Sequence, residues 1–221
     1  MRKLLIVVPL LILVLIVIDR AGVWIAEREI GARVQSAYGL PARPDVSVRG
    51  FPFLTQVASG NYQEIDVSVK AASAHGVRVR DIHARFTGVR APLSLLFGQN
   101  SGTVTASQAT GTALIPYAQV QRRLPRGISL AADGGRLRVT GRTTRGTVAG
   151  TARLGVTRSG VSVTPEHLTV GGVSAGALAA RFTVVIPVRA LPLHLSVTGV
   201  RAAAGGLVVA AAAHDVAFAG A

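Results

Sequence analysis

A serine with the spacing of a hydrolase nucleophile is the clearest catalytic signal in this sequence. The segment Gly172-Val173-Ser174-Ala175-Gly176 matches the G-x-S-x-G pattern, in which a serine on a strand-to-helix turn attacks a carbonyl carbon. That mechanism also needs an acid and then a histidine later in the chain. The acid after Ser174 is Asp215, and no histidine follows Asp215. We therefore interpret the match as a glycine-rich turn and predict that the protein is not an enzyme.

The other titratable residues do not have the spacing of a catalytic or metal centre. The chain has no cysteine, which excludes thiolate ligands and disulfides. Glu64 and Asp66 lie on the same face of a predicted strand, where we expect arginine or lysine partners rather than acid–base chemistry. We predict no catalytic residue, no metal and no cofactor. The histidines, none at metal-ligand spacing, are His75, His83, His167, His194 and His214.

Arginine dominates the charge of the chain. The formal net charge is +14, with 24 Lys plus Arg against 10 Asp plus Glu. Between Arg122 and Arg158 there are nine arginines and one acid. Such a region is either the solvated face of a hairpin or a surface that contacts anionic lipid headgroups, at about 1 kcal/mol per basic residue. We predict headgroup contacts at Arg122, Arg123 and Arg126. Aromatic residues make up only 5% of the chain, which disfavours stacking on single-stranded nucleic acid.

Two apolar segments are not explained by strand alternation. They either close the ends of the core or form the mouth or lining of a cavity for acyl chains. Burying an acyl chain is favourable by about 0.8 kcal/mol per methylene, so such a site needs no catalytic residue. We predict that these side chains bind lipid: Phe51, Phe53, Leu54, Leu93, Leu95, Leu96 and Phe97.

Apolar residues alternate with polar residues from Asp45 onward, which predicts β-strands. The alternation changes parity between Val79 and Ile82, which indicates a β-bulge. Turns are predicted at Asp133-Gly134-Gly135, Ser159-Gly160 and Gly205-Gly206. Short helices are predicted at 92–97 and 116–123, each beginning with proline. We expect an α+β fold with a long N-terminal helix against one strongly curved antiparallel sheet.

The N-terminus predicts a membrane anchor. Arg2 and Lys3 precede an apolar run from Leu4 to Ile18, which is about 22 Å long as a helix. A cleaved signal peptide is the alternative, but the small residues of a cleavage site are poorly placed. A helix face with Val23, Ile30, Val34 and Tyr38 follows, so one rod could leave the membrane. We predict an uncleaved anchor over residues 1–22 and a single extracytoplasmic domain over 23–221.

One segment carries a family resemblance. The stretch from Gly50 to Gln56, Gly-Phe-Pro-Phe-Leu-Thr-Gln, is followed by Gly60 and Tyr62. Together with Asp45-Val46, the Pro92 turn, the segment 111–117 and the motif Leu191-Pro192-Leu193, it resembles the LmeA family of actinobacterial envelope proteins. The resemblance covers residues 24–218. It implies an exported phospholipid binder with a tubular lipid-binding roll, and in mycobacterial members a role in lipomannan-type glycolipid elongation.

These observations predict a membrane-anchored protein that holds a phospholipid or related amphiphile in an apolar groove between helix and sheet. Its expected partners are that lipid, an anionic membrane surface and an envelope glycolipid synthase, with no nucleic acid. It would lie in the cell membrane with one N-terminal span and its main domain outside. The alternative is a structural protein of the envelope that recruits a synthase or binds an anionic wall polymer.

Overall fold

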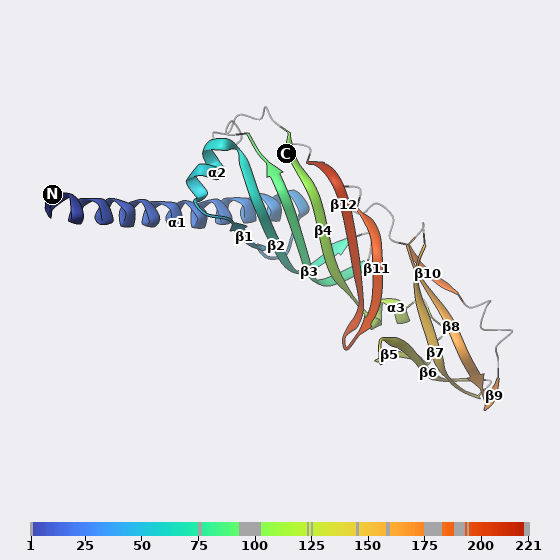
Figure 1. Ribbon diagram of the computed structural model, residues 1–221. Helices are drawn as coiled ribbons and strands as arrows, with labels where there is room; N and C mark the ends of the chain where they lie inside the picture. The colour runs from blue at the N-terminus through green and yellow to red at the C-terminus, as the bar shows by residue number, and fades with distance from the viewer. Residues whose placement is uncertain are drawn as a thin grey trace. The chain divides into compact units, whose positions relative to one another are not determined.

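The computed structural model describes residues 2–74, 77–92, 103–122, 124, 126–144, 146–157, 160–174, 183–187, 193 and 195–218. The chain forms three helices and twelve strands within these residues (Figure 1). The helices are α1 (Arg2–Tyr38), α2 (Phe53–Ser59) and α3 (Tyr117–Gln121). The strands are β1 (Asp45–Arg49), β2 (Asn61–Ala74), β3 (Val77–Arg90), β4 (Val104–Pro116), β5 (Ile128–Asp133), β6 (Arg136–Thr143), β7 (Gly146–Thr157), β8 (Gly160–Val170), β9 (Val173–Ser174), β10 (Val184–Pro187), β11 (Ser196–Ala203) and β12 (Gly206–Phe218).

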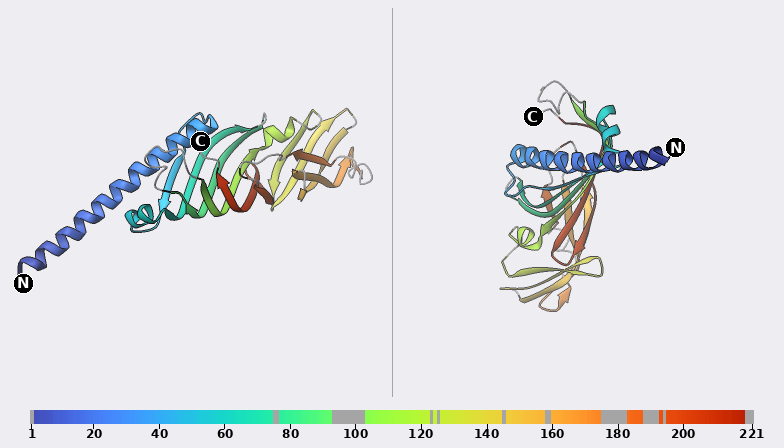
Figure 2. Two further views of the ribbon diagram at one scale, coloured as in Figure 1. Left: turned by 90° about the horizontal axis from the view of Figure 1, so that it is seen from above. Right: turned by 90° about the vertical axis from the view of Figure 1, so that its left-hand side faces the viewer.

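Helix α1 is continuous from the apolar N-terminus to Tyr38, which confirms the predicted rod. Its first half extends beyond the strands, and the side chains from Ile6 to Val17 are exposed (Figure 2). Its second half packs against β1 and α2, with Val23 buried and Ile30 half-buried. The helix ends before Gly39, whose φ of 57° is the left-handed conformation that glycine adopts without a Cβ clash. One helix of this length and apolarity is thus a candidate membrane span.

The strands form two antiparallel sheets, which confirms the fold class but corrects the expectation of a single sheet. The first sheet has the order β1-β2-β3-β4-β12-β11. The second has the order β10-β8-β7-β6-β5, and β9 pairs with β8. Alternation indicates which side chains share a face, but it does not indicate which strands pair. The pairing of β4 with β12, about a hundred residues later, is not visible in any local pattern.

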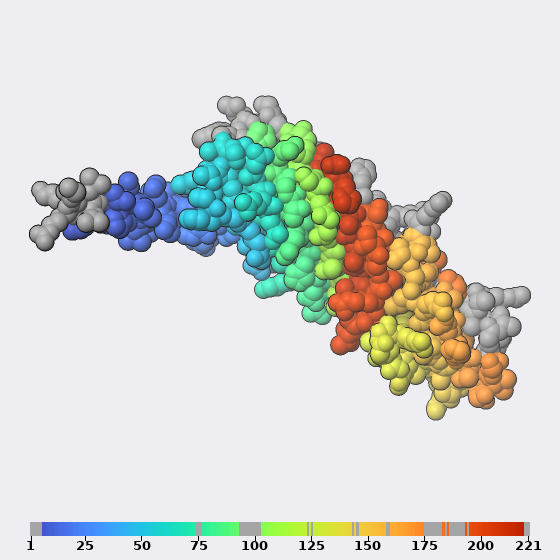
Figure 3. Space-filling model, in the orientation of Figure 1, coloured from blue at the N-terminus to red at the C-terminus, as the bar shows by residue number. Residues whose placement is uncertain are grey.

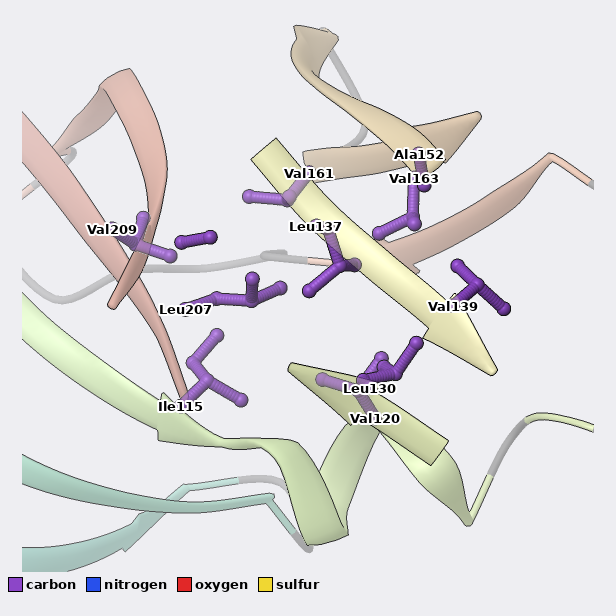
Figure 4. Packing of buried hydrophobic residues seen from close by; sticks show 11 residues of the cluster. Ile115, Val120, Leu130, Leu137, Val139, Ala152, Val161, Val163, Leu207 and Val209 are labelled. Carbon is purple, nitrogen blue, oxygen red and sulfur yellow. The ribbon is translucent and has the colours of Figure 1, made fainter. Parts of the chain in front are cut away.

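The chain divides into two compact units. Unit 1 contains residues 1–69, 83–109 and 214–221, and unit 2 contains residues 70–82 and 110–213. Unit 2 has a closely packed aliphatic core in which Leu137 and Leu207 are completely buried (Figure 4). The boundaries between the units fall within β2, β3, β4 and β12. The prediction of a single domain over 23–221 therefore remains a prediction.

The bulge predicted from the change of parity in β3 is confirmed at Asp81. Asp81 has a φ of 48°, and both it and Arg80 are exposed before the alternation resumes at Ile82. His167 in β8 and Asp215 in β12 adopt the same left-handed conformation inside their strands. This conformation is uncommon for residues other than glycine, although Asp and His are enriched in it. The β7–β8 register shifts opposite His167, between Ala149 and Thr151.

The short helices test the proline-based predictions. Helix α3 confirms the helix predicted over 116–123, with Pro116 at its N-cap. No helix was predicted for the Gly-Phe-Pro-Phe segment, but it leads directly into helix α2 at Phe53. Seven residues give too little periodicity to distinguish a helix from a loop. The helix predicted over 92–97 lies outside the described residues apart from Pro92. The predicted turn at Gly134-Gly135 is confirmed, with positive φ at both glycines.

Candidate lipid-binding site

Helix α2 is fixed to α1 by a buried carboxylate. Asp19 is only 2% exposed, although it follows the long apolar run of α1. The backbone N–H of Leu54 donates to Asp19 Oδ1 at 2.9 Å, and Arg20 Nη2 donates to Oδ2 at 2.6 Å. Because α2 has Pro52 at its N-cap and no capping side chain of its own, Asp19 supplies the acceptor that its first turn lacks.

The Gly-Phe-Pro-Phe motif positions α2 against this point. Gly50 has a φ of 107°, and a Cβ at Gly50 would lie 2.7 Å from Gln56 Nε2. Gln56 is buried, and its Oε1 accepts the backbone N–H of Gln63 at 3.0 Å. The motif therefore requires glycine at its first position because the Gln56 side chain folds back over it. We call α1 residues 19–28 and residues 50–59 together the collar.

Three of the predicted lipid-binding residues lie in the collar, and one of them is buried while two are exposed. Phe53 is 5% exposed, packs 6.2 Å from the Tyr62 ring between centroids, and lies against Gly22. Phe51 is 62% exposed, and the Arg20 guanidinium lies 5.4 Å from its ring centroid. Leu54 is 40% exposed. Phe53 thus joins the core of unit 1, while Phe51 and Leu54 face outward.

The helix–sheet layer of unit 1 is apolar but only partly closed. Its buried residues include Val23, Phe53 and Tyr62, and burial raises the pKa of the Tyr62 phenol. The rings of Phe86 and Phe218 meet edge to face, 5.3 Å apart between centroids, and both remain half-buried. The half-buried apolar side chains packed on this layer are Ala26, Ile30, Val57, Ile65, Phe86, Ala91, Val104 and Phe218.

The paired carboxylates of β2 belong to an arginine network, as predicted. Arg49 Nε lies 2.6 Å from Asp66 and 3.1 Å from Glu64, and Arg85 Nε lies 2.8 Å from Asp66. Partial burial by itself raises the pKa of Asp66, but the hydrogen bonds from Arg49 and Arg85 outweigh it and hold this pKa below its usual value. The network cross-links β1, β2 and β3 on the polar face of the sheet.

The collar, most of the apolar layer and the second half of α1 lie within the span of one family. A family model described as LmeA-like phospholipid-binding matches residues 17–212. The chain belongs to the LmeA-like phospholipid-binding family. No curated protein and no solved structure is significantly similar to it.

The LmeA-like match includes both the collar and the arginine-rich segment of unit 2. Arg122 and Arg126, predicted to contact headgroups, are exposed, and neither forms an ion pair within the described part of the chain. Arg138 pairs with Asp133 at 2.7 Å, and Arg153 pairs with Glu166. Among the described arginines of this segment, Arg138 and Arg153 on the sheet are therefore neutralised, whereas Arg122 and Arg126 beside α3 are not. Arg123 lies outside the described residues.

Several predicted site residues of this LmeA-like chain lie outside the residues that the structure describes. Leu93, Leu95, Leu96 and Phe97 lie outside the described residues, as do Ala175 and Gly176 of the serine motif. Ser174 is exposed in the short strand β9, after a turn in which Gly171 and Gly172 have positive φ. Among the described residues, no group of three His, Asp or Glu is arranged to hold a metal ion.

Most of the collar was not predicted from the sequence, in which no partner was identified for Asp19, Arg20 or Trp24. The structure places the Arg28 guanidinium 3.9 Å from the Trp24 ring centroid. The available signal was an acid beside an apolar run, since such a residue needs a partner. The sequence does not reveal that partner, because Leu54 is 35 residues away.

Proposed function

We propose that this protein is a membrane-anchored phospholipid-binding protein of the cell envelope. Helix α1 would cross the membrane once, and the remainder would lie on the extracytoplasmic side. The observation that carries the proposal is the family match over residues 17–212, joined to a helix–sheet layer whose apolar side chains are only half-buried. No enzyme activity is part of the proposal.

In this proposal, acyl chains lie along the half-buried apolar side chains of unit 1. Phe86 and Phe218 would contact them from the sheet, and Ile30 would contact them from α1. Each methylene removed from water contributes about 0.8 kcal/mol. Contact along several methylenes of one acyl chain would therefore hold a lipid without any covalent bond. Phe51, Leu54 and the segment with Leu93, Leu95, Leu96 and Phe97 are proposed to form the mouth, and the buried Phe53 is proposed to support it from the core.

The headgroup is proposed to be anionic. Arg122, Arg123 and Arg126 would attract phosphate, and the net charge of +14 favours an anionic membrane surface. The bound lipid would serve envelope lipid or glycolipid assembly, where a glycolipid synthase is the proposed partner.

The test is mass spectrometry of the full chain, extracted in a mild detergent and analysed for co-purified phospholipid. We expect the Phe86→Ser/Phe218→Ser double variant to retain several-fold less phospholipid than the parent protein. The matched control is Val156→Ser, an exposed valine on β7 in unit 2. Circular dichroism serves to check that each variant keeps its strand content. A folded double variant with the parent's lipid content would contradict the proposed layer.

The second candidate is a structural protein that recruits an envelope synthase or binds an anionic wall polymer. The packed core of unit 2, with Leu137 and Leu207 completely buried, favours it, because such a core is filled by the protein's own side chains. Charge reversal at Arg122 and Arg126 separates the two candidates. Lost binding to an anionic polymer with unchanged lipid content would support the structural role.

A further inference from the structure

The collar carries exposed apolar side chains where α1 leaves its long apolar run. On α1 these are Trp24 and Ile25, at 56% and 61% exposure. On the α2 side they are Phe51 and Leu54. Arginine stands beside both aromatic rings, with Arg20 over Phe51 and Arg28 over Trp24. Aromatic rings with neighbouring cations are typical of the interface between acyl chains and headgroups.

The apolar run of α1 is too short to cross a bilayer by itself. From Leu4 to Ile18 it rises about 22 Å, whereas the hydrocarbon core is about 30 Å thick. Continuing the span to Ile25 gives about 33 Å, but this places Asp19 inside the apolar zone. An unpaired carboxylate there would be costly.

Helix α2 lowers the cost of placing the Asp19 carboxylate there. It covers the Asp19 carboxylate almost completely, and Leu54 and Arg20 both donate hydrogen bonds to it. Because Leu54 N lies 2.9 Å from Asp19 Oδ1, the first turn of α2 lies at the same height along α1 as Asp19. Asp19 precedes Ile25 by six residues, so the first turn of α2 lies about 9 Å from Ile25 along the helix axis, toward the N-terminus. Figure 3 shows α2, in cyan, against the exposed rod of α1.

We infer that the collar is embedded in the membrane interface on the unit 1 side, with Phe51 and Leu54 among the acyl chains, the Asp19–Arg20 pair at the same depth, and Arg28 at the phosphates. The inference rests on the proposed membrane span of α1. Interfacial segments bury about 5–10 Å into the headgroup and acyl boundary, which agrees with the height of α2. Since Phe53 of the same helix belongs to the core of unit 1, α2 would connect the bilayer directly to the apolar layer proposed to hold lipid.

Environment-sensitive probes at single cysteines test this inference, because the chain has no native cysteine. The full chain is labelled with a nitrobenzoxadiazole dye at Phe51→Cys and reconstituted in phosphatidylcholine vesicles containing phosphatidylglycerol. Val14→Cys serves as the probe of the span, and Tyr38→Cys, exposed at the far end of α1, serves as the aqueous control. We expect the Phe51 and Val14 dyes to show blue-shifted emission and quenching by lipid-borne spin labels. The Tyr38 dye should show neither.

The outcomes separate the inference from the proposed function. A buried Val14 dye with an aqueous Phe51 dye would overturn the embedded collar and leave the membrane anchor intact. Aqueous dyes at both positions would overturn the anchor and the collar together. Trp24 is the single tryptophan of the chain, so its emission gives a label-free measurement. Quenching of Trp24 by shallowly brominated lipids supports the inference, and its absence contradicts it.

Discussion

At the scale of single residues, Asp19 decides whether α2 keeps its place on α1. Its carboxylate is the acceptor for the Leu54 N–H, and leaving a buried N–H without an acceptor costs about 1–3 kcal/mol. We expect Asp19→Ala to speed hydrogen exchange at the Leu54 amide by about tenfold or more. Asp19→Asn keeps an oxygen acceptor and should exchange at nearly the parent rate. The Val48 amide, which donates to Glu27, should be unaffected in both variants.

Asp66 makes the stability of the protein depend on pH. Its folded-state pKa lies below the ordinary value of 3.8 because Arg49 and Arg85 donate hydrogen bonds to it, despite the opposing effect of burial. The stability that the Asp66 carboxylate contributes is therefore fully present above its unfolded-state pKa, and it is lost as the pH falls through its folded-state pKa. We expect the stability difference between the parent protein and Asp66→Asn to shrink as the pH is lowered below 3.8. Urea unfolding in detergent at several pH values measures it, and a pH-independent difference would contradict this reading.

At the scale of elements, the bulge in β3 sets which side chains of that strand face the core. Asp81 adopts a left-handed conformation at φ 48°, which costs a β-branched residue about 1–2 kcal/mol. We expect Asp81→Val to lower the free energy of unfolding by that amount and Asp81→Gly to raise it by up to about 1 kcal/mol. Arg80→Val is the control, because Arg80 is an exposed neighbour in ordinary strand conformation. Equal destabilisation by both valine substitutions would show that the bulge is not the cause.

The same element shows what the sequence can predict. The parity change between Val79 and Ile82 located the bulge, because alternation is a local signal. The pairing of Glu64 and Asp66 with arginine also followed from local charge. Helix α2 was missed, because seven residues beginning after Pro52 have neither a capping side chain nor a clear period. The division into two sheets was missed because strand pairing is set by contacts between distant segments.

The candidate site, like the fold, could be predicted from the sequence only where the signal was local. The Gly-Phe-Pro-Phe motif indicated the right segment, since glycine and proline restrict the backbone strongly. The different environments of Phe51 and Phe53 could not be read from the sequence, because they depend on where Asp19 of α1 holds the helix. Tertiary hydrogen bonds thus decided which apolar side chain enters the core and which faces outward.

At the scale of the whole molecule, the distribution of basic residues runs opposite to the usual rule for membrane orientation. Lysine and arginine normally stay on the cytoplasmic side of a span, yet most of the 24 basic residues follow α1. The rule counts short flanking segments, however, because long domains cross regardless of their charge. Arg2 and Lys3 directly flank the apolar run on its N-terminal side. On the other side Arg20 pairs with Asp19 and Arg33 pairs with Glu29, which leaves Arg28 as the basic residue of α1 with no ion pair there among the residues that the structure describes. The flanking charges therefore favour an N-terminus inside.

The flanking charges predict that the main domain lies on the extracytoplasmic side of the membrane. Thr140 is exposed on β6, so a Thr140→Cys variant in the cysteine-free chain reports the position of unit 2. We expect a membrane-impermeant maleimide to label it in intact cells to the same extent as in lysed cells. Labelling only after lysis would place the domain inside, and it would show that the basic residues of the whole molecule outweigh Arg2 and Lys3. Intact mass of the labelled chain decides at the same time between an anchor and a cleaved signal, since cleavage would remove the mass of the N-terminal segment from the 22.8 kDa chain.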